Sequence, residues 1–223
     1  MLVKIKDIFK RRLKKALNET NLISGNVKIG KNVYVSGCRL EGDISIAEQC
    51  KLYQCDINGN VNIQRFSSIW GPNVNIYGHV EIGSFCSIAR NVSLQEYYHD
   101  FNRLTSYYIF KNLFDDAGVN ENLTKGPITI GSDVWIGMHS CILSGVKIGD
   151  GAVIAANSVV NTDVPDFAIV AGSPAKIVDF RFSNEIIKEL KKVRWWDWTM
   201  EEITKHKSLF SGDITLDKIH SIE

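Results

Sequence analysis

The sequence lacks the features of a membrane-spanning or secreted protein. No apolar run approaches the roughly 18 residues that cross a bilayer, and no apolar segment follows the basic N-terminus as it would in a signal peptide. The cysteines are odd in number and show no CxxC spacing; they are Cys38, Cys50, Cys55, Cys86 and Cys141. We therefore expect a cytoplasmic protein with reduced thiols, without a disulfide framework or a zinc site.

A large excess of charge of one sign is also absent. The formal net charge is +1, yet residues 1–17 hold seven Lys/Arg and one acidic residue. The remainder therefore carries 19 basic and 24 acidic residues, a net charge of −5. This balance excludes the strongly basic body of a general nucleic-acid-binding protein. With 44% hydrophobic residues in 223, the chain is long enough for a sizeable apolar core.

What the sequence does have is a six-residue repeat of branched aliphatic residues. This period fits neither an amphipathic helix nor an alternating strand. Single-residue slips separate its blocks, with five residues from Leu52 to Ile57 and seven from Ile69 to Ile76. The repeated positions are Ile29, Val35, Leu40, Ile46, Leu52, Ile57, Ile63, Ile69, Ile76, Ile82, Ile88, Leu94, Ile130, Ile136, Ile142, Ile148, Ile154 and Val160.

A period of six is typical of short strands that are joined by turns and wound around a prism. Three repeats close one coil of about 18 residues, with each aliphatic side chain pointing inward, about 4.8 Å from its equivalent in the next coil. Glycine recurs after many repeats, and we expect it to supply the backbone angles of the turns; the positions are Gly30, Gly83, Gly131, Gly137 and Gly149. We predict an all-β fold, a parallel β-helix of about six coils over residues 23–178.

A polar and aromatic loop interrupts the repeat at residues 95–127. Loops longer than about 12–15 residues in a compact domain are usually functional or disordered. The aromatic residues of this loop indicate that it is ordered and packed; they are Tyr97, Tyr98, Tyr107, Tyr108, Phe110 and Phe114.

Both ends of the chain are predicted to be helical. Residues 179–223 form a C-terminal helical cap and tail, with an N-cap at Ser183 and a capping box from Thr199 to Glu202. We expect Trp195, Trp196 and Trp198 to close the end of the coil, whose last strand edge needs a cover. Residues 1–22 form a basic helix. Its segment 3–17 either packs on the protein or makes weak contact with an anionic membrane surface.

Three segments resemble a known family, the hexapeptide-repeat acyltransferases. Residues 126–178, which contain DVWIG and AGSPAK, are similar to the family as a whole. The segments YYHDFNRLTSYYIF (97–110) and FRFSNEIIKELKKVRWWDW (180–198) resemble its xenobiotic acetyltransferase branch. That branch includes streptogramin and chloramphenicol O-acetyltransferases and enzymes that modify bacterial surface polysaccharides. The resemblance implies a left-handed coil, acetyl-CoA as co-substrate, and a homotrimer whose active sites lie between neighbouring subunits.

By the same resemblance, His99 matches the catalytic histidine of the family. A hydroxyl is a poor nucleophile near neutral pH, and a neutral imidazole can accept its proton as it attacks a thioester. We predict direct acetyl transfer with His99 as general base. Either Asp100 or a backbone carbonyl could orient the ring. His79 and His139 lie on the coil. A metal site is not expected, because it would need a second histidine close to another in the loop, and only His99 lies there.

The resemblance also implies contacts to the donor, and the chemistry of aromatic side chains indicates contacts to the acceptor. Coenzyme A contacts are predicted at Trp135, Gly137, Met138, Ala156, Asn161, Thr162, Pro174, Lys176 and Arg181, where the two cations would meet the nucleotide phosphates. Many relatives have serine where Met138 stands, so a side-chain hydrogen bond is lost there. Flat aromatic faces for a sugar acceptor are predicted at Trp70, Tyr98, Tyr107 and Tyr108.

The acceptor is the least specified part of the prediction. The basic helix, the additional early coils and the absence of a long N-terminal substrate arm favour an O-acetyltransferase of surface polysaccharide. The alternatives are an antibiotic O-acetyltransferase and an amino-sugar N-acetyltransferase. A β-helix that only binds a partner would show no affinity for coenzyme A and no need for His99.

Overall fold

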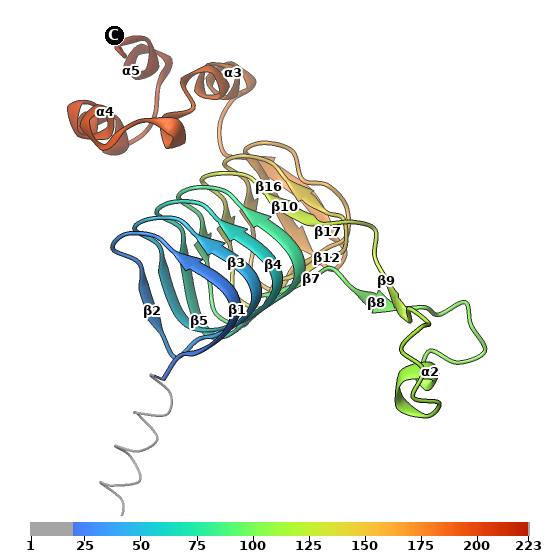
Figure 1. Ribbon diagram of the computed structural model, residues 1–223. Coiled ribbons are helices and arrows are strands. Elements are labelled where there is room, and N and C mark those ends of the chain that lie inside the picture. Colours follow the sequence, from blue (N-terminus) through green and yellow to red (C-terminus); the bar gives the residue numbers. More distant parts are fainter. Residues whose placement is uncertain (1–19, 223) are drawn as a thin grey trace, which may run out of the picture.

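The six-residue period determines how the chain winds. In the computed structural model, which describes residues 20–222, successive strands turn about one axis, and each pairs in parallel with the strand one coil away (Figure 1). The result is a left-handed parallel β-helix, as predicted. A loop with its own small sheet projects from this coil, and a helical region follows the last strand of the coil (Figure 1).

The strands form three faces that repeat in chain order. The first face contains the end of β5 with β10 and β13, the second β6, β11, β14 and β16, and the third β7, β12 and β15. The antiparallel pair β16–β17 ends the sheet. The bounds are β1 (Leu22–Ile29), β2 (Tyr34–Ser36), β3 (Arg39–Ile46), β4 (Lys51–Ile63), β5 (Ser68–Ile82), β6 (Ser87–Ile88), β7 (Ser93–Gln95), β10 (Ile128–Ile130), β11 (Trp135–Ile136), β12 (Cys141–Leu143), β13 (Lys147–Ile148), β14 (Val153–Ile154), β15 (Val159–Val160), β16 (Ala168–Gly172) and β17 (Ala175–Phe180).

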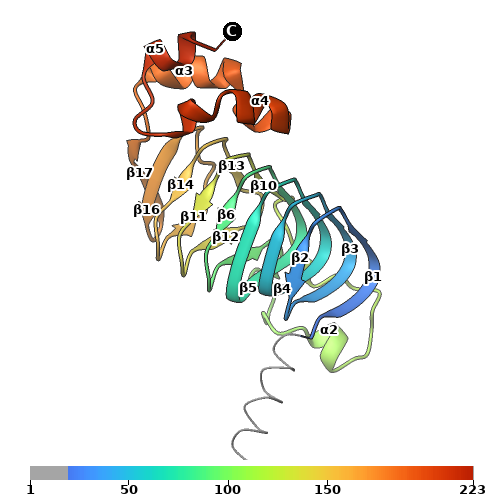
Figure 2. The same ribbon diagram turned by 90° about the vertical axis from the view of Figure 1, so that its left-hand side faces the viewer.

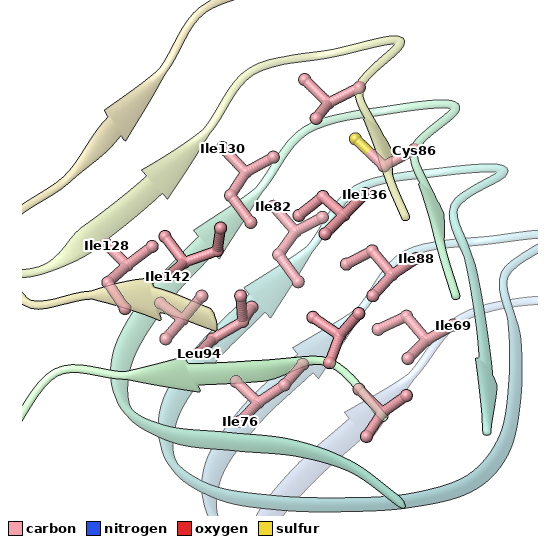
Figure 3. Packing of buried hydrophobic residues seen from close by; sticks show 14 of the residues in the cluster. Ile69, Ile76, Ile82, Cys86, Ile88, Leu94, Ile128, Ile130, Ile136 and Ile142 are labelled. Atoms are coloured by element: carbon pink, nitrogen blue, oxygen red, sulfur yellow. The ribbon is translucent and has the colours of Figure 1, made fainter. Parts of the chain in front are cut away.

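The repeated aliphatic residues stack inside the coil in columns, one for each face (Figure 3). The predicted positions from Leu40 to Val160 are all at most 3% exposed. Strand register shows the stacking directly: Ile136 lies opposite Ile88 in one neighbouring coil and Ile154 in the other. Ile29, 45% exposed, and the partly buried Val35 are the exceptions, because they lie in the first described coil, which pairs with another described coil on one side only.

The recurring glycines are required for space rather than for their backbone angles, which corrects the prediction. The five glycines expected to supply turn angles do not have positive φ. A Cβ at Gly137 would lie 2.6 Å from the backbone nitrogen of Ala156, and one at Gly131 would lie 2.7 Å from that of Asp150. The adjacent coil passes too close for any side chain. The left-handed angles belong to other corner residues, such as Asp133 and His139.

Helices follow the coil, and their ends agree with the sequence. Ser183 caps α3 by accepting from the backbone N–H of Ile186, and the capping box of Thr199 and Glu202 is present. These side chains satisfy backbone donors that the first helical turn leaves free. The elements are α3 (Asn184–Val193), η1 (Trp195–Asp197), α4 (Met200–Lys205), η2 (Lys207–Phe210) and α5 (Leu216–His220).

The helical region covers the side of the coil and not its end, contrary to the expected role of the tryptophans (Figure 2). Phe66 and Phe85, which take left-handed corner positions, stack on each other outside the coil with ring centroids 4.9 Å apart. The Trp195 ring lies 4.8 Å from that of Phe85, and Trp196 is 1% exposed. This apolar corner of the coil can be buried only by a partner lying alongside it.

Arg65 fastens the helical region to this corner. Its guanidinium donates to the carbonyls of Trp196, at 2.9 Å, and of Trp198. We expect Arg65→Met, which keeps the apolar stem, to speed hydrogen exchange of residues 195–210 by roughly tenfold, the effect of losing hydrogen bonds worth about 1–3 kcal/mol. Mass spectrometry would measure the exchange, with Arg39→Met as the control. Unchanged exchange in this segment would show that its apolar contacts alone hold it.

Two sequence expectations concern membranes. None of the described helices, of which α3 with ten residues is the longest, has the length and apolar character needed to cross a membrane. The predicted basic helix and its membrane-contacting segment, residues 3–17, lie outside the described residues.

Candidate functional site

The projecting loop is anchored to the coil by a buried carboxylate. Glu96, 5% exposed, accepts hydrogen bonds from the backbone N–H of His79 and from the hydroxyl of Thr124, at 2.9 Å. It thereby joins the beginning and the end of the loop at the corner between the third and first faces. Beyond this anchor, β8 (Tyr98–His99) pairs antiparallel with β9 (Asn122–Leu123), and α2 (Ile109–Asn112) lies between them (Figure 1).

His99 is exposed on β8, and its ring is held from two directions. Its Nδ1 lies 2.6 Å from the carbonyl oxygen of Ser106, and its ring stacks on that of Tyr108 with centroids 4.2 Å apart. A carbonyl oxygen only accepts, so Nδ1 carries the proton and donates it. In the neutral ring, Nε2 is then unprotonated and has the lone pair that a general base needs.

Asp100 does not orient His99, and the structure favours the other option, a backbone carbonyl. The Asp100 carboxylate accepts from the backbone N–H of Asn102, at 3.0 Å, and pairs with Arg103, at 2.9 Å. The Asn102 N–H and the Arg103 guanidinium hold the pKa of Asp100 below its ordinary value. Arg103 also donates to the carbonyl of Asn120, so this pair ties together the two halves of the loop.

A hollow of about 620 Å³ lies beside His99. Aromatic and polar side chains from both the coil and the loop line it, among them Tyr77, Tyr97, Tyr108 and Lys111. Such a mixture of flat apolar faces and hydrogen-bonding groups suits a hydroxylated acceptor. Of the four predicted acceptor residues, the structure places only Tyr108 in this hollow.

A second hollow, of about 260 Å³, lies at the same corner of the coil. It brings Asn161, predicted to contact the donor, together with Tyr98, predicted to contact the acceptor; Phe101 and Lys125 also line it. Thr162 follows on the exposed surface. Tyr107 lies apart, 57% exposed on the loop. Sequence alone could not show that Asn161 and Tyr98 are neighbours, because 62 residues separate them.

Most predicted donor contacts lie at a different corner, between the second and third faces. Gly137 and Ala156 pack against each other there, and Met138 beside them is 43% exposed. Trp135, 56% exposed, points outward from the second face. Ala89, another small residue, lies one coil away in the same column. Its backbone N–H donates to the carbonyl of Ile136, the residue that precedes Gly137. We call this column of Ala89, Gly137 and Ala156 the track.

Three further predicted residues border this track. Pro174 lies in the turn between β16 and β17, and Lys176 is exposed at the start of β17 beside it. Trp70, 50% exposed, lies next to Ile69, which pairs with Ile88 below the Gly137 position. Its ring packs on Tyr53 at 5.3 Å. Trp70 therefore belongs to the track and is separated from the loop within one chain.

Arg181 occupies the third corner, where its charge is already used. It pairs with Asp133 at 2.8 Å and donates to the carbonyl of Gly151 at 2.8 Å. Burial raises the pKa of Asp133, and the Arg181 charge opposes that rise. Both contacts use Nη1 and tie the segment between β17 and α3 to the coil, while the predicted phosphate contact of Arg181 stays a prediction.

The structure also identifies functional candidates that the sequence analysis missed. Glu96, Glu121 and Ser106 hold the loop and the His99 ring, as the contacts above and below show. The available signal was that acidic residues, Glu96 and Glu121 among them, lie inside an aromatic loop, a pattern that has no defined functional meaning. Among residues 20–222, no group of three His, Cys, Asp or Glu side chains could hold a metal ion. His79 contacts Glu81, and His139 contacts Asn91.

Comparison with known proteins agrees with this geometry. Residues 127–162 match the family described as bacterial transferase hexapeptide with six repeats. A chloramphenicol acetyltransferase of Morganella morganii is 40% identical over 128 residues, 55% of this chain and 61% of that protein. A probable macrolide acetyltransferase of Lysinibacillus sphaericus is 38% identical over 146 residues, 62% of this chain and 80% of that protein.

A solved structure shows the same fold. AntD, an N-acyltransferase from Bacillus cereus in complex with dTDP and 3-hydroxybutyryl-CoA, superposes with a TM-score of 0.61. The match covers 85% of this chain and 97% of AntD at 24% sequence identity.

Proposed function

This chain belongs to the hexapeptide-repeat acetyltransferase family, and on that premise we propose that it transfers an acetyl group from acetyl-CoA to a sugar hydroxyl of a bacterial surface polysaccharide. The observation that carries the chemistry is the free Nε2 of His99, beside a hollow lined by aromatic and polar side chains. The comparisons support the acetyl transfer, and the loop supports a hydroxylated acceptor.

The proposed reaction is a direct transfer between two bound substrates. His99 Nε2 accepts the proton of the acceptor hydroxyl while its oxygen attacks the carbonyl carbon of the thioester. The carbon–sulfur bond breaks, coenzyme A leaves as a thiolate, and the proton held by His99 returns to the thiolate or to water. The Ser106 carbonyl, which accepts from Nδ1, stabilises the positive ring that forms in between.

We further propose that the active form is a homotrimer. His99 is held on a projecting loop, while the track of Gly137 and Ala156 lies on another corner of the same coil. The loop exposes apolar side chains that a neighbouring subunit would cover, since large exposed apolar groups often mark interfaces; these are Phe101 at 73%, Leu104 at 107%, Leu113 at 67% and Phe114 at 57%. The loop of one subunit would thus face the track of the next.

Within such a trimer the track fits the donor. Small residues allow the pantetheine arm to approach the backbone closely, and the exposed Lys176 provides a cation for the nucleotide phosphates. Trp135 and Pro174 would pack against the apolar parts of the donor. Asn161 and Thr162 would contact it near the loop.

Antibiotic O-acetylation is a second candidate function, and the relatives favour it. A chloramphenicol acetyltransferase and a probable macrolide acetyltransferase are 40% and 38% identical to this chain over more than half its length. An amine acceptor is a third candidate and would depend less on a base, because a neutral amine is already nucleophilic. We place the reaction in the cytoplasm, and the basic segment 3–17 supports the proposal of weak membrane contact.

Coenzyme A binding and acceptor-dependent thiol release test the proposal in two steps. Isothermal titration with coenzyme A should give binding, and its absence would contradict the enzyme. Release of thiol from acetyl-CoA should then depend on the acceptor, measured with capsule-type oligosaccharides, chloramphenicol, a macrolide and an amino sugar. Turnover only with the antibiotics would replace the polysaccharide assignment with the second candidate.

A further inference from the structure

We propose that Glu121 is a positioning residue, which fixes the tautomer and orientation of the His99 ring through the segment Ser106–Tyr108. The effect on turnover rests on the proposed function. The effect on the ring itself does not, and it can be measured without a substrate. Glu121 does not touch His99, so its contribution has to pass through this segment.

One short segment holds the imidazole at two points. Ser106 supplies the carbonyl that accepts from Nδ1 at 2.6 Å, and Tyr108 supplies the ring that stacks at 4.2 Å with an interplanar angle of 29°. The Thr105 hydroxyl accepts from the backbone N–H of Tyr107 and stabilises the turn between them. Any shift of this segment therefore moves both contacts together.

Tyr108 is held in turn by the strand opposite His99. Its hydroxyl donates to Oδ1 of Asn122 at 2.7 Å, and Asn122 pairs with His99 across β8 and β9. Partial burial raises the pKa of Tyr108, so its hydroxyl keeps the proton near neutral pH and can donate. With one ring face and its hydroxyl engaged, Tyr108 is better described as a support for His99 than as the acceptor contact predicted from sequence.

Glu121 anchors the other end of the segment. It is 8% exposed, and its two carboxylate oxygens accept from the backbone N–H groups of Phe110, at 3.1 Å, and Lys111, at 2.9 Å. These groups begin α2, which directly follows Tyr108 and has only four residues. Such a short helix has little stability of its own. A buried carboxylate with two backbone donors is among the stronger anchors that a protein can provide.

The substitution Glu121→Gln tests this anchor with almost no change of shape. A carboxamide oxygen can accept from one N–H, while its NH₂ group would face the other N–H and cannot bond to it. Heteronuclear NMR on protein labelled at the histidine ring nitrogens would report the His99 tautomer, with His99→Ala used to assign the signal. We expect the Nδ1–H form to dominate in the unaltered protein and to give way to a mixture in Glu121→Gln.

Kinetics provide the second readout. Glu121→Gln is expected to lower kcat about tenfold while the KM for acetyl-CoA changes by less than about twofold, because small misplacement of a catalytic group costs rate more than binding. Glu121→Asp should have a higher kcat than Glu121→Gln. Tyr108→Phe, which keeps the stacking on His99, should have a higher kcat than Tyr108→Leu, which does not. The control is Asp115→Asn, an exposed carboxylate on the same loop.

The outcomes separate this inference from the proposed function. An unchanged His99 tautomer in a folded Glu121→Gln protein would overturn the positioning role, whatever the activity. A changed tautomer in a protein that transfers no acetyl group would support the positioning role and contradict the proposed function. If Glu121→Gln does not fold, the comparison of Tyr108→Leu with Tyr108→Phe decides, and equal tautomer ratios in the two would overturn the inference.

Discussion

Replacement of His99 by alanine is expected to lower turnover by about 10²-fold or more, with unchanged affinity for coenzyme A. The size follows from the usual contribution of general-base catalysis, and 10²-fold corresponds to about 2.7 kcal/mol of transition-state stabilisation. Two neighbouring groups are already engaged: the Asp100 carboxylate is paired with Arg103, and the Tyr108 hydroxyl donates to Asn122. Coenzyme A affinity should survive because His99 lies on the projecting loop and not on the track.

Stopped-flow or continuous thiol-release assays with a fixed acceptor would measure this loss. His220→Ala provides the matched control, since His220 is exposed at the end of α5 and far along the chain from the loop. Turnover retained in His99→Ala would remove this residue from the base role. Loss of coenzyme A binding together with turnover would instead show that the loop contributes to the donor site.

Two inactive variants are expected to restore activity to each other when they share a trimer. His99→Ala removes the base, and Ala156→Trp places a large ring on the exposed track without entering the core, since Ala156 is exposed. If the loop of one subunit serves the track of the next, a mixed cyclic trimer of these two chains has both parts intact at one of its three interfaces. Its activity should therefore be about one third of that of the unaltered trimer.

Co-expression with two different affinity tags and sequential purification would isolate the mixed trimers. The control is the same purification with two differently tagged copies of His99→Ala, which should remain inactive. Activity of the mixed trimer no greater than that of its inactive parents would place the base and the track in one chain. Sedimentation of the purified protein as a monomer would contradict the trimer itself.

The prediction of the coil came from a local rule repeated many times. Each aliphatic residue at the first position of a hexad is followed six residues later by another, so the same short geometry is specified again and again. Even the slips were informative, because the short step from Leu52 to Ile57 and the long step from Ile69 to Ile76 fall at the same corner. The caps at Ser183 and Thr199 were equally local and equally predictable.

What the sequence did not reveal has a different origin, which is contact between residues far apart in the chain. Arg181 could be read as a free cation in sequence, and its pairing with Asp133, 48 residues away, became visible only in the fold. The tryptophans after α3 were expected at the end of the coil, whereas Trp195 packs against Phe85 at the side of the coil. In both cases the type of residue was clear from the sequence, but the distant residue that it contacts was not.

The sequence by itself determined that this chain is a hexapeptide-repeat β-helix with one interrupting loop, because a periodic pattern acts through neighbours six residues apart and through equal steps between coils. Only the tertiary structure decided how the loop holds His99. That arrangement depends on Ser106, Tyr108 and Glu121 meeting through hydrogen bonds and ring stacking across β8, β9 and α2. Such contacts follow no period, and their energies arise only when the backbone has already brought the groups together.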